Sequence, residues 1–304
     1  MSAKCNMCGS DRNAVLLRDG LSYYSVIRCE SCGLAFAAPQ PSPDEIESFY
    51  KDDYTYFTPQ YEKSHRNKDY KKALQVLGEI EEFCSNGHLL DVGSAVGTFL
   101  SAAQDRGWEP EGLEISEDAS RIARQRGFLV HSGSIEDVSI RKDFYDVVTM
   151  MDSLEHVRNP LDALRKINLS MRRNGLIVIE TPNFASIYRR LIGRRWVGFN
   201  KYHLFFFTPD SISAMLAAAG LKVLRLNTTN ADLISRDSLF RWGMRDAIAG
   251  IFRKNTISLK TAGTTSAGNF PIELTEKALN LPFSFLLNKL NLGDQIRVYA
   301  RKTG

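Results

Sequence analysis

Four of the five cysteines stand in two identical short pairs near the N-terminus. Cys5 and Cys8 form one C-x-x-C pair, and Cys29 and Cys32 form the second, 20 residues further on. Zinc binds four thiolates in a tetrahedron, and a C-x-x-C turn brings two sulfurs of one loop to the same ion. We therefore predict a structural Zn²⁺ site of the zinc-ribbon type, with no open coordination position. A redox pair or two unrelated pairs are the alternatives, although the segment lacks the βαβ pattern in which redox pairs normally lie.

A second chemical signal begins at residue 88 and ends in a turn of small residues. Residues 88–92 read as a short apolar strand that carries Asp91, and the turn Gly93-Ser-Ala-Val-Gly97 leads into a helix. Strand, glycine turn and helix form the nucleoside-binding crossover of Rossmann-like sheets. A dinucleotide site has G-x-G-x-x-G facing a pyrophosphate, which a carboxylate at this loop would repel. Asp91 therefore favours a cation, such as the amino group and sulfonium of S-adenosylmethionine, whose methionyl tail the small residues admit.

An acidic residue also ends the next predicted strand, over residues 109–115. Glu114 lies 17 residues beyond Gly97, where a carboxylate can accept both ribose hydroxyls of an adenosine. A strand-end Glu is by itself often only a charge at a helix N-terminus, and Ser116 is predicted to cap a helix here. Paired with Asp91, Glu114 predicts an adenosine site, with residues 133–136 at the adenine edge.

Further apolar segments must build the sheet that positions these residues. We expect strands at 128–130, 144–151, 176–180, 221–226 and 295–300, short helices near 44–50 and after Pro209, and an amphipathic helix over 68–83. About 65 residues separate the last two strands, far more than a hairpin loop needs. Apolar residues at helical spacing from Phe240 to Phe252 and from Phe283 to Leu290 predict two helices there, joined by a flexible connector at 261–268.

The predicted fold is a doubly wound, Rossmann-like α/β domain with a seven-stranded sheet, an N-terminal zinc ribbon and an α-helical insertion before the last strand. We expect the ribbon and its linker at 1–60, the core at 61–230, the insertion at 231–291 and the final strand at 292–304. The three prolines between residues 37 and 43 are predicted to keep this part of the linker out of both helix and sheet.

Composition limits the class of protein. The chain has 304 residues, 43% of them hydrophobic and 24% charged, which indicates a globular protein and excludes a disordered or collagen-like one. The net charge of +4 is too small to imply nucleic-acid binding by itself. No apolar stretch approaches the roughly 18 residues of a membrane span, and the N-terminus lacks the apolar region of a secretory signal. We therefore expect a cytoplasmic protein without disulfides.

Together these motifs resemble class I S-adenosylmethionine-dependent methyltransferases, over about residues 68–228 and again at the C-terminus. The matching segments are Leu90–Gly97, Glu114, Asp152–Val157, Thr181–Asn183 and His203–Pro209. The cysteine leader resembles the zinc-binding leader of methyltransferases from sugar and exopolysaccharide pathways. The resemblance implies cofactor contacts from Asp91, Gly93, Ser94, Gly97, Glu114, Ile115, Ser134, Ile135 and Asp152. Ala95 departs from the family pattern, which usually has Gly there, and Ser134 stands where an Asp often contacts the adenine.

Methyl transfer requires an acceptor held in line with the sulfonium and, for a hydroxyl or a carbon acid, a base. His156 and His203 are the candidates for this catalytic role, and for each the alternative is a structural histidine that anchors a loop. In the sugar C-methyltransferases the histidine corresponding to His203 follows a Tyr-x-Glu pattern. Asn200 and Tyr202 stand at those places here, which favours O-methylation.

Basic residues without any acid mark the segment between Thr181 and Pro209, and aromatic residues are interleaved with them. Arginine forks suit phosphate, so we interpret the segment as a site for the diphosphate of a nucleotide sugar or lipid-linked glycan. A solvated helix face and a stacking platform for single-stranded RNA are the alternatives. Zinc-leader ribosomal-RNA methyltransferases typically have C-x2-C…C-x3-H, and no His lies near Cys32. The predicted acceptor residues are Arg189, Arg190, Arg194, Arg195 and Tyr202.

The function that these observations favour is methylation of a small acceptor, a sugar, nucleotide-sugar or lipid-linked glycan hydroxyl. C-methylation of a deoxysugar, O-methylation of a quinone and methylation of RNA are alternatives, with nucleic acid disfavoured as a partner. An NAD-type oxidoreductase or a non-enzymatic zinc-ribbon adaptor would use the same fold without methyl transfer. Basic amphipathic helices in the insertion would also suit peripheral contact with the inner face of a membrane, although core packing and a substrate lid compete with that interpretation.

Overall fold

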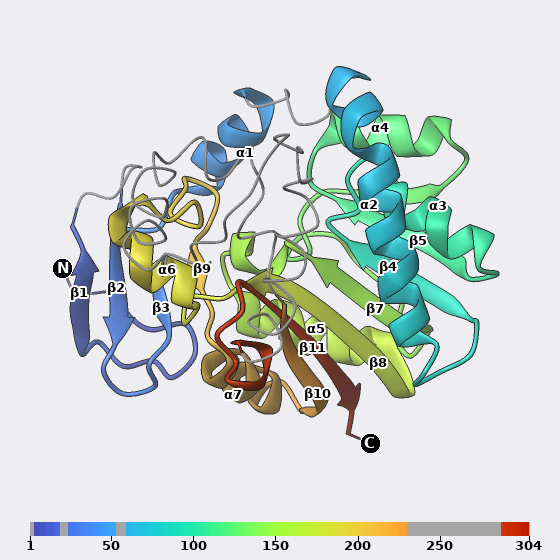
Figure 1. Ribbon diagram of the computed structural model, residues 1–304. Helices are drawn as coiled ribbons and strands as arrows, with labels where there is room; N and C mark the ends of the chain where they lie inside the picture. Colours follow the sequence, from blue (N-terminus) through green and yellow to red (C-terminus); the bar gives the residue numbers. More distant parts are fainter. Residues whose placement is uncertain (1–2, 19–23, 53–58, 230–286, 304) are drawn as a thin grey trace, which may run out of the picture.

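The computed structural model describes residues 3–18, 24–52, 59–229 and 287–303. A seven-stranded sheet with the order β10-β11-β8-β7-β4-β5-β6 lies at its centre (Figure 1). The strands are β4 (His88–Val92), β5 (Glu109–Glu114), β6 (Leu129–Ser132), β7 (Tyr145–Met151), β8 (Met171–Pro182), β10 (Leu221–Thr229) and β11 (Gln295–Lys302). Neighbouring strands are parallel except that β11 runs antiparallel to both β8 and β10. The predicted doubly wound, seven-stranded α/β fold is confirmed.

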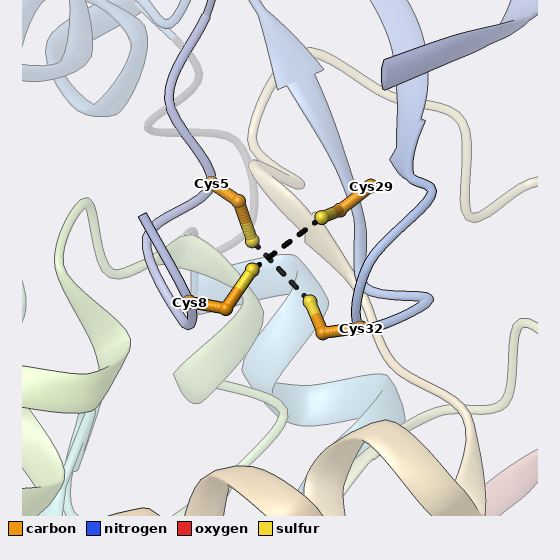
Figure 2. Close-up of side chains that lie close together, drawn as sticks. All are labelled: Cys5, Cys8, Cys29 and Cys32. Carbon is orange, nitrogen blue, oxygen red and sulfur yellow. Dashed lines mark hydrogen bonds between the residues drawn. The ribbon is translucent and has the colours of Figure 1, made fainter. Parts of the chain in front are cut away.

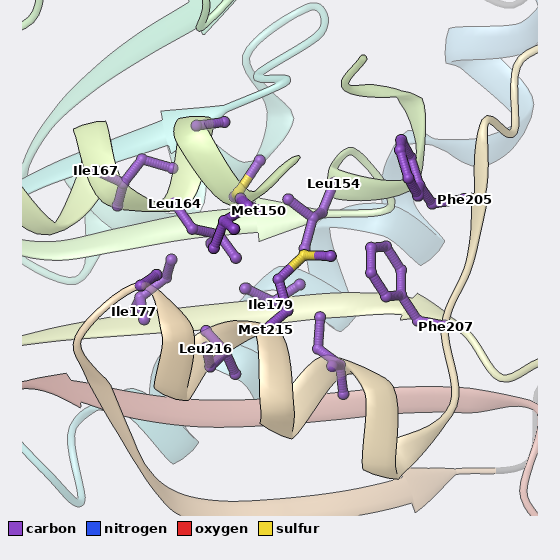
Figure 3. Packing of buried hydrophobic residues seen from close by; sticks show 14 of the residues in the cluster. Met150, Leu154, Leu164, Ile167, Ile177, Ile179, Phe205, Phe207, Met215 and Leu216 are labelled. Carbon is purple, nitrogen blue, oxygen red and sulfur yellow. The ribbon is translucent and has the colours of Figure 1, made fainter. Parts of the chain in front are cut away.

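Helices cover both faces of this sheet. They are α2 (Pro59–Ile80), α3 (Thr98–Asp105), α4 (Glu117–Gln125), α5 (Pro160–Ser170) and α7 (Pro209–Ala218). Val76 and Leu77 of α2 are buried in one apolar cluster with Val147 and Val178 of the sheet. On the opposite face, α5 and α7 pack on the strands through the side chains drawn in Figure 3. Helix α2 begins nine residues before the predicted helix. The prediction missed its first turns because they carry mostly polar residues without an apolar period.

The N-terminal segment forms a second, four-stranded antiparallel sheet with the order β1-β2-β3-β9. Its strands are β1 (Asn13–Leu17), β2 (Ser25–Cys29), β3 (Ala35–Ala38) and β9 (Phe205–Phe206). The prediction that the proline-rich linker avoids helix and sheet is wrong at both of its ends. Strand β3 continues to Ala38, directly before Pro39, and helix α1 (Pro43–Asp52) begins at a proline, whose missing N–H costs nothing in a first turn.

The N-terminal leader, which is described over residues 3–18 and 24–52, packs directly on the α/β core. Strand β9, which pairs with β3, belongs to the segment between β8 and α7, so one sheet joins parts of the chain about 170 residues apart (Figure 1). Phe36 of the leader is buried in the same apolar cluster as Leu154 and Phe205 of the core. The core therefore loses apolar cover wherever the leader is displaced.

Several predictions fall on residues outside the described part of the chain. They concern the helices at 240–252 and 283–286 and the connector at 261–268. Of the predicted insertion only residues 287–291 are described, so the proposed division into four segments stays a prediction. Within the described ranges, no helix has the length and apolar character needed to cross a bilayer.

Candidate active site

The four leader cysteines converge on one point, as Figure 2 shows. The Sγ atoms of Cys5 and Cys32 lie 3.4 Å apart, those of Cys8 and Cys29 lie 3.5 Å apart, and all four are within 4.8 Å of one another. Tetrahedral zinc with bonds of 2.3 Å separates its sulfurs by about 3.8 Å, and a disulfide would need about 2.05 Å. The donor set and its spacing therefore fit a four-thiolate zinc ion and do not fit a disulfide.

Backbone groups prepare one of these thiols for a metal. Burial raises the pKa of Cys29, but hydrogen bonds from the backbone N–H groups of Cys32 and Ser31 outweigh it and lower the pKa to about 7. Burial also raises the pKa of Cys5, whose side chain is 2% exposed. Because a metal ion must displace the remaining thiol protons, binding at this cluster releases protons and is favoured by high pH.

Two adjoining cavities open at the carboxyl ends of the parallel strands, where the strand order reverses beside β4. Such a switch point is the usual ligand site of open α/β sheets. One cavity of about 810 Å³ extends over β5 and β6, and another of about 680 Å³ extends toward α2 and the segment 197–203. Five residues line both cavities: Gly93, Ala95, Met151, Asp152 and His156. A ligand that spans this wall can present one end to each cavity.

Asp91 stands at the floor of the 680 Å³ cavity, at the end of β4. Its carboxylate is 3% exposed and accepts a hydrogen bond of 2.7 Å from Thr149 of β7. Burial raises the pKa of Asp91 to about 7, although the bond from Thr149 lowers it. A buried carboxylate with one fixed partner gains most from a cationic ligand, which offsets its desolvation. The site therefore suits an ammonium or sulfonium group.

The turn after β4 brings backbone to the cavity surface. Gly93 has φ +85°, and a Cβ placed there would lie 2.8 Å from the Cβ of Ser153. Gly97, with φ +83°, is the N-cap of α3 and lines neither cavity, so its role is to turn the chain. Ala95 also lies in the left-handed region, with φ +48°, which an alanine tolerates at modest cost. The buried hydroxyl of Ser94 has no hydrogen-bond partner within the described residues, and this residue lines the 680 Å³ cavity.

Glu114 ends β5 and lines the 810 Å³ cavity. Its two carboxylate oxygens accept backbone hydrogen bonds of 2.8 Å, one from Ala95 and one from Ser116. Burial raises the pKa of this carboxyl. Each oxygen keeps a second lone pair, so the carboxylate is held in place and can still accept a pair of vicinal hydroxyls. The three other residues predicted at the adenosine, Ile115, Ser134 and Ile135, line the same cavity.

The leader also contributes to the cofactor side. Pro43 and Ile46 of α1 line the 810 Å³ cavity. The side-chain amide of Asn6 donates to the carbonyl of Arg158, which lines that cavity too. Sequence reasoning missed these contributions, because nothing in the leader's own pattern indicates which part of the core it covers.

Two half-buried histidines face the 680 Å³ cavity. Their ring centroids lie 5.0 Å apart, and His156 stacks on Tyr202, which lines the cavity as well. Burial lowers the pKa of His156 to about 3, and the neighbouring His203 adds to this; burial likewise lowers the pKa of His203 to about 4. Both imidazoles are therefore neutral at physiological pH and able to accept a proton.

Two further buried acids, Glu155 and Glu180, lie close to residues that line this cavity, and neither had a predicted role. Glu155 of η2 (Leu154–His156) is 1% exposed, accepts a hydrogen bond of 2.9 Å from Thr181, and has a carboxylate oxygen within 4.8 Å of nitrogens of both histidines. Glu180 of β8 is ion-paired with Lys72 of α2 and with Arg297 of β11. A single buried acid does not change the hydrophobic periodicity of its segment. The only sequence signal for such a residue is its place near the end of a predicted strand.

The predicted acceptor residues separate into two groups. Tyr202 lies in the cavity wall, beside Asn200. Arg189, Arg190, Arg194 and Arg195 lie on α6 (Ile187–Ile192) and η3 (Gly193–Arg195) and line neither cavity. Trp196 and Phe199, which were weighed as a stacking platform, are buried against the leader.

Comparison with known proteins gives one family. The model of a methyltransferase domain matches residues 62–226. A ubiquinone biosynthesis O-methyltransferase of Nitrosomonas europaea is 26% identical over 196 residues, which are 59% of this chain and 82% of that protein. A dTDP-3-amino-3,6-dideoxy-alpha-D-glucopyranose N,N-dimethyltransferase of Streptomyces fradiae is 32% identical over 122 residues, 38% of this chain and 48% of that protein.

Solved structures show the same fold. An S-adenosylmethionine-dependent methyltransferase of Archaeoglobus fulgidus superposes with a TM-score of 0.54 at 19% identity, covering 81% of this chain and 99% of its own. One from Thermotoga maritima superposes with a TM-score of 0.53 at 16% identity, covering 85% and 99%.

Proposed function

Since the chain belongs to the methyltransferase-domain family and is an S-adenosylmethionine-dependent methyltransferase, we propose that it methylates a hydroxyl of a small, saccharide-type acceptor. The observation that carries the proposal is the pair of neutral, half-buried histidines facing a cavity whose floor is Asp91. A carboxylate for a cationic donor and a base for an acceptor then stand in one continuous space.

The cofactor residues divide between the two cavities. Glu114, Ile115, Ser134 and Ile135 would hold the adenosine, and Asp91, Gly93, Ser94 and Asp152 would hold the methionyl end, with Gly97 acting through the turn. When bound, S-adenosylmethionine supplies an electrophilic methyl group. Because Asp91 is buried and its carboxylate accepts a hydrogen bond from Thr149, a positive group beside it would stabilise its ionised form.

The acceptor side performs the proton transfer. A hydroxyl that receives a methyl group becomes strongly acidic, so its proton has to be accepted by a nearby base. His203 takes the hydroxyl proton at that stage, so a base of low pKa suffices. His156, stacked on Tyr202, orients the acceptor and is the second candidate for the base.

The acceptor class follows from the wall of the 680 Å³ cavity. Ala73, Val76 and Phe99 offer an apolar face, and Arg66, Asp69 and Asn200 offer polar groups. A hydroxylated ring, polar at its edge and apolar on one face, matches this surface. Among the relatives, the name of the Streptomyces fradiae N,N-dimethyltransferase specifies a sugar nucleotide as its acceptor, and that of the Nitrosomonas europaea protein specifies O-methylation. An RNA acceptor is disfavoured, because Trp196 and Phe199 are buried and offer no stacking surface.

The leader is proposed to bind a structural Zn²⁺ ion through Cys5, Cys8, Cys29 and Cys32. The support is the convergence of four sulfurs at distances that suit one tetrahedral ion. When bound, the ion links the loop of Cys5 and Cys8 to the loop of Cys29 and Cys32.

Two measurements test the proposed function. Calorimetric titration of the purified protein should show binding of S-adenosylhomocysteine and no binding of NAD. Methyl transfer from labelled S-adenosylmethionine should then be measured with free sugars, nucleotide sugars and catechols in parallel. Labelling confined to catechols would reject the saccharide-type acceptor, and NAD binding without S-adenosylhomocysteine binding would reject the function altogether.

A further inference from the structure

The loop that carries His203 is shaped by one asparagine. The side-chain oxygen of Asn200 accepts hydrogen bonds from the backbone N–H groups of Tyr202 (2.9 Å) and His203 (3.2 Å), and its amide donates to the carbonyl of Val197. These bonds fix the loop's own conformation. They all lie within residues 197–203, so they do not fix where the loop stands relative to the cavity.

The position of the loop is set from two opposite sides. The N–H of Leu204 donates to the carbonyl of Glu155 at 2.8 Å, which ties the loop to the core beside His156. The carbonyl of Leu204 accepts from the N–H of Ala37 at 2.8 Å, which ties it to the leader, and strands β3 and β9 continue that pairing. Leu204 follows His203 directly, so the leader's sheet holds the backbone next to the proposed base.

One leader side chain reaches the backbone of His203. The hydroxyl of Tyr24 lies 3.0 Å from the carbonyl oxygen of His203 and also contacts the carbonyl of Asn200. Its ring is 7% exposed and is buried in one apolar cluster with Trp196 and Phe199 of the same loop. The hydroxyl of Tyr24 thus contacts the first and the last carbonyl of the turn formed by residues 200–203.

We propose that Tyr24 is a positioning residue for methyl transfer. Its hydroxyl holds the main chain of His203, so the leader, which carries the four cysteines, sets the direction of the imidazole. The inference rests on the proposed role of His203. A hydroxyl aimed at two carbonyls in a buried cluster resists sliding of the loop, whereas apolar packing alone is tolerant of small shifts. A shift of about 1 Å in a reacting group is enough to lower a rate about 100-fold.

The test compares Tyr24→Phe with Tyr188→Phe. Both changes remove one hydroxyl from rings that pack in or against the same cluster, and Tyr188 lies on α6 rather than in the leader. Three quantities are measured for each full-length variant: hydrogen exchange of the amides at 199–207, the NMR titration of the His203 imidazole, and kcat with the Kd for S-adenosylhomocysteine.

The expected result is specific to Tyr24→Phe. Amides of the loop should exchange about tenfold faster, since a net hydrogen bond is worth about one factor of ten in the opening equilibrium. The pKa of His203, which burial lowers to about 4, should rise toward its ordinary value as water enters, while Glu155 and His156 on η2 keep their places. kcat should fall about tenfold with Kd unchanged, because Tyr24 does not line the 810 Å³ cavity in which the adenosine is proposed to bind. Tyr188→Phe should match the unsubstituted protein throughout.

Each failure has a separate meaning. Unchanged exchange and an unchanged His203 titration in Tyr24→Phe would overturn the inference, even if methyl transfer is normal. Faster exchange with an unchanged kcat would also overturn it, since the contact would then be structural only. Absence of methyl transfer in the unsubstituted protein would instead reject the proposed function, and it would leave the exchange and NMR results readable.

Discussion

The two cavities that meet at Gly93 and Asp152 are built in different ways. The 810 Å³ cavity, where the adenosine is proposed to bind, takes its walls mainly from the strand ends and the turns that follow them. These residues lie within 92–95, 113–117, 132–137 and 151–159. The 680 Å³ cavity, where the acceptor is proposed to meet the methionyl end of the donor, shares strand-end residues within 91–99 and 151–156. It adds two distant segments, residues 66–76 of α2 and residues 197–203, and the leader bonds to the backbone beside the second. Local backbone conformation therefore makes most of the first cavity, whereas packing between distant segments completes the second.

The difference also appears in how each functional group is held. Glu114 is fixed by backbone N–H groups at positions 95 and 116, close to it in the chain or in the sheet. His203 depends on Tyr24 and on the pairing of β3 with β9, over 160 residues away. Damage to the leader should thus impair the acceptor side first, and damage to the glycine turn should impair the cofactor side first.

The largest effect is expected from removal of the metal ion. Cys29→Ala, or treatment with a strong zinc chelator, should lower methyl transfer at least about 100-fold, because binding of structural zinc contributes directly to folding and the leader holds the loop of His203. The Kd for S-adenosylhomocysteine should rise much less. Metal content, activity and calorimetry measure the three quantities. Cys84→Ala is the matched control, as this cysteine lies outside the cluster; full activity of metal-free protein would contradict the prediction.

A substitution in the glycine turn should have the opposite pattern. Gly93→Ala forces a Cβ to within 2.8 Å of Ser153 at φ +85°, so the turn must shift away from the cofactor. We expect the Kd for S-adenosylhomocysteine to rise about 100-fold, equivalent to about 2.7 kcal/mol. Gly127→Ala is the control, because it imposes the same backbone strain at φ +93° with no atom within 4 Å of the added Cβ. Equal binding by the two variants would show that strain, and not the close approach, decides the effect.

His203→Gln should separate turnover from cofactor binding. General bases typically contribute a factor of about 100 or more, so kcat should fall by about that factor while the Kd for S-adenosylhomocysteine stays constant. His131→Gln serves as control, since that histidine lines neither cavity. If His203→Gln retains full turnover, the base is another group, and His156→Gln becomes the decisive variant.

Donor binding and turnover should also respond differently to pH, although Asp91 and both histidines line the same 680 Å³ cavity. Burial raises the pKa of Asp91 to about 7, so this carboxyl gains a proton between pH 8 and pH 6, and affinity for a cationic donor should fall up to about tenfold. kcat at saturating donor should stay flat over that range, because both histidines remain neutral down to pH values near 4. Calorimetry and initial rates at matched pH decide the point. A kcat that falls along with affinity would contradict the prediction, because the base of methyl transfer would then titrate between pH 8 and pH 6.

The same raised pKa has a consequence for stability. A carboxyl whose pKa is higher in the folded state than in the unfolded chain stabilises the fold below the unfolded value near 3.8, and this contribution is lost as pH rises through about 7. Asp91→Asn should therefore melt at a higher temperature than the unsubstituted, ligand-free protein at pH 8, and bind the cofactor less tightly. A lower melting temperature at pH 8 would contradict the burial of an ionised carboxylate.

The smallest effect is expected on the arginine-rich surface. Arg194 and Arg195 are exposed on η3 and line neither cavity, so replacing both by Ala should change the KM for a nucleotide-sugar acceptor less than about threefold. A larger rise, absent with an acceptor that lacks phosphate, would extend the acceptor site onto this surface and support the diphosphate contact.

The position of the strand-end acids was predictable from the sequence. Asp91 and Glu114 each follow an apolar run and precede a turn or a cap, and in a parallel sheet such positions meet at one edge. The cysteine pairs were equally plain, because two C-x-x-C turns have few uses other than one metal ion. By contrast, no motif or periodic pattern in the sequence predicts a role for Glu155, Lys72 or Tyr24.

The amino-acid order by itself thus determined the sheet, the cofactor edge and the cysteine cluster, since each depends on periodicity or on neighbours a few residues apart. Only the tertiary structure decided that the leader's third strand pairs with β9, that Tyr24 meets the backbone of His203, and that four arginines stay outside both cavities. The physical reason is that an apolar face is encoded locally, whereas the partner that covers it is selected by shape and packing across the whole chain.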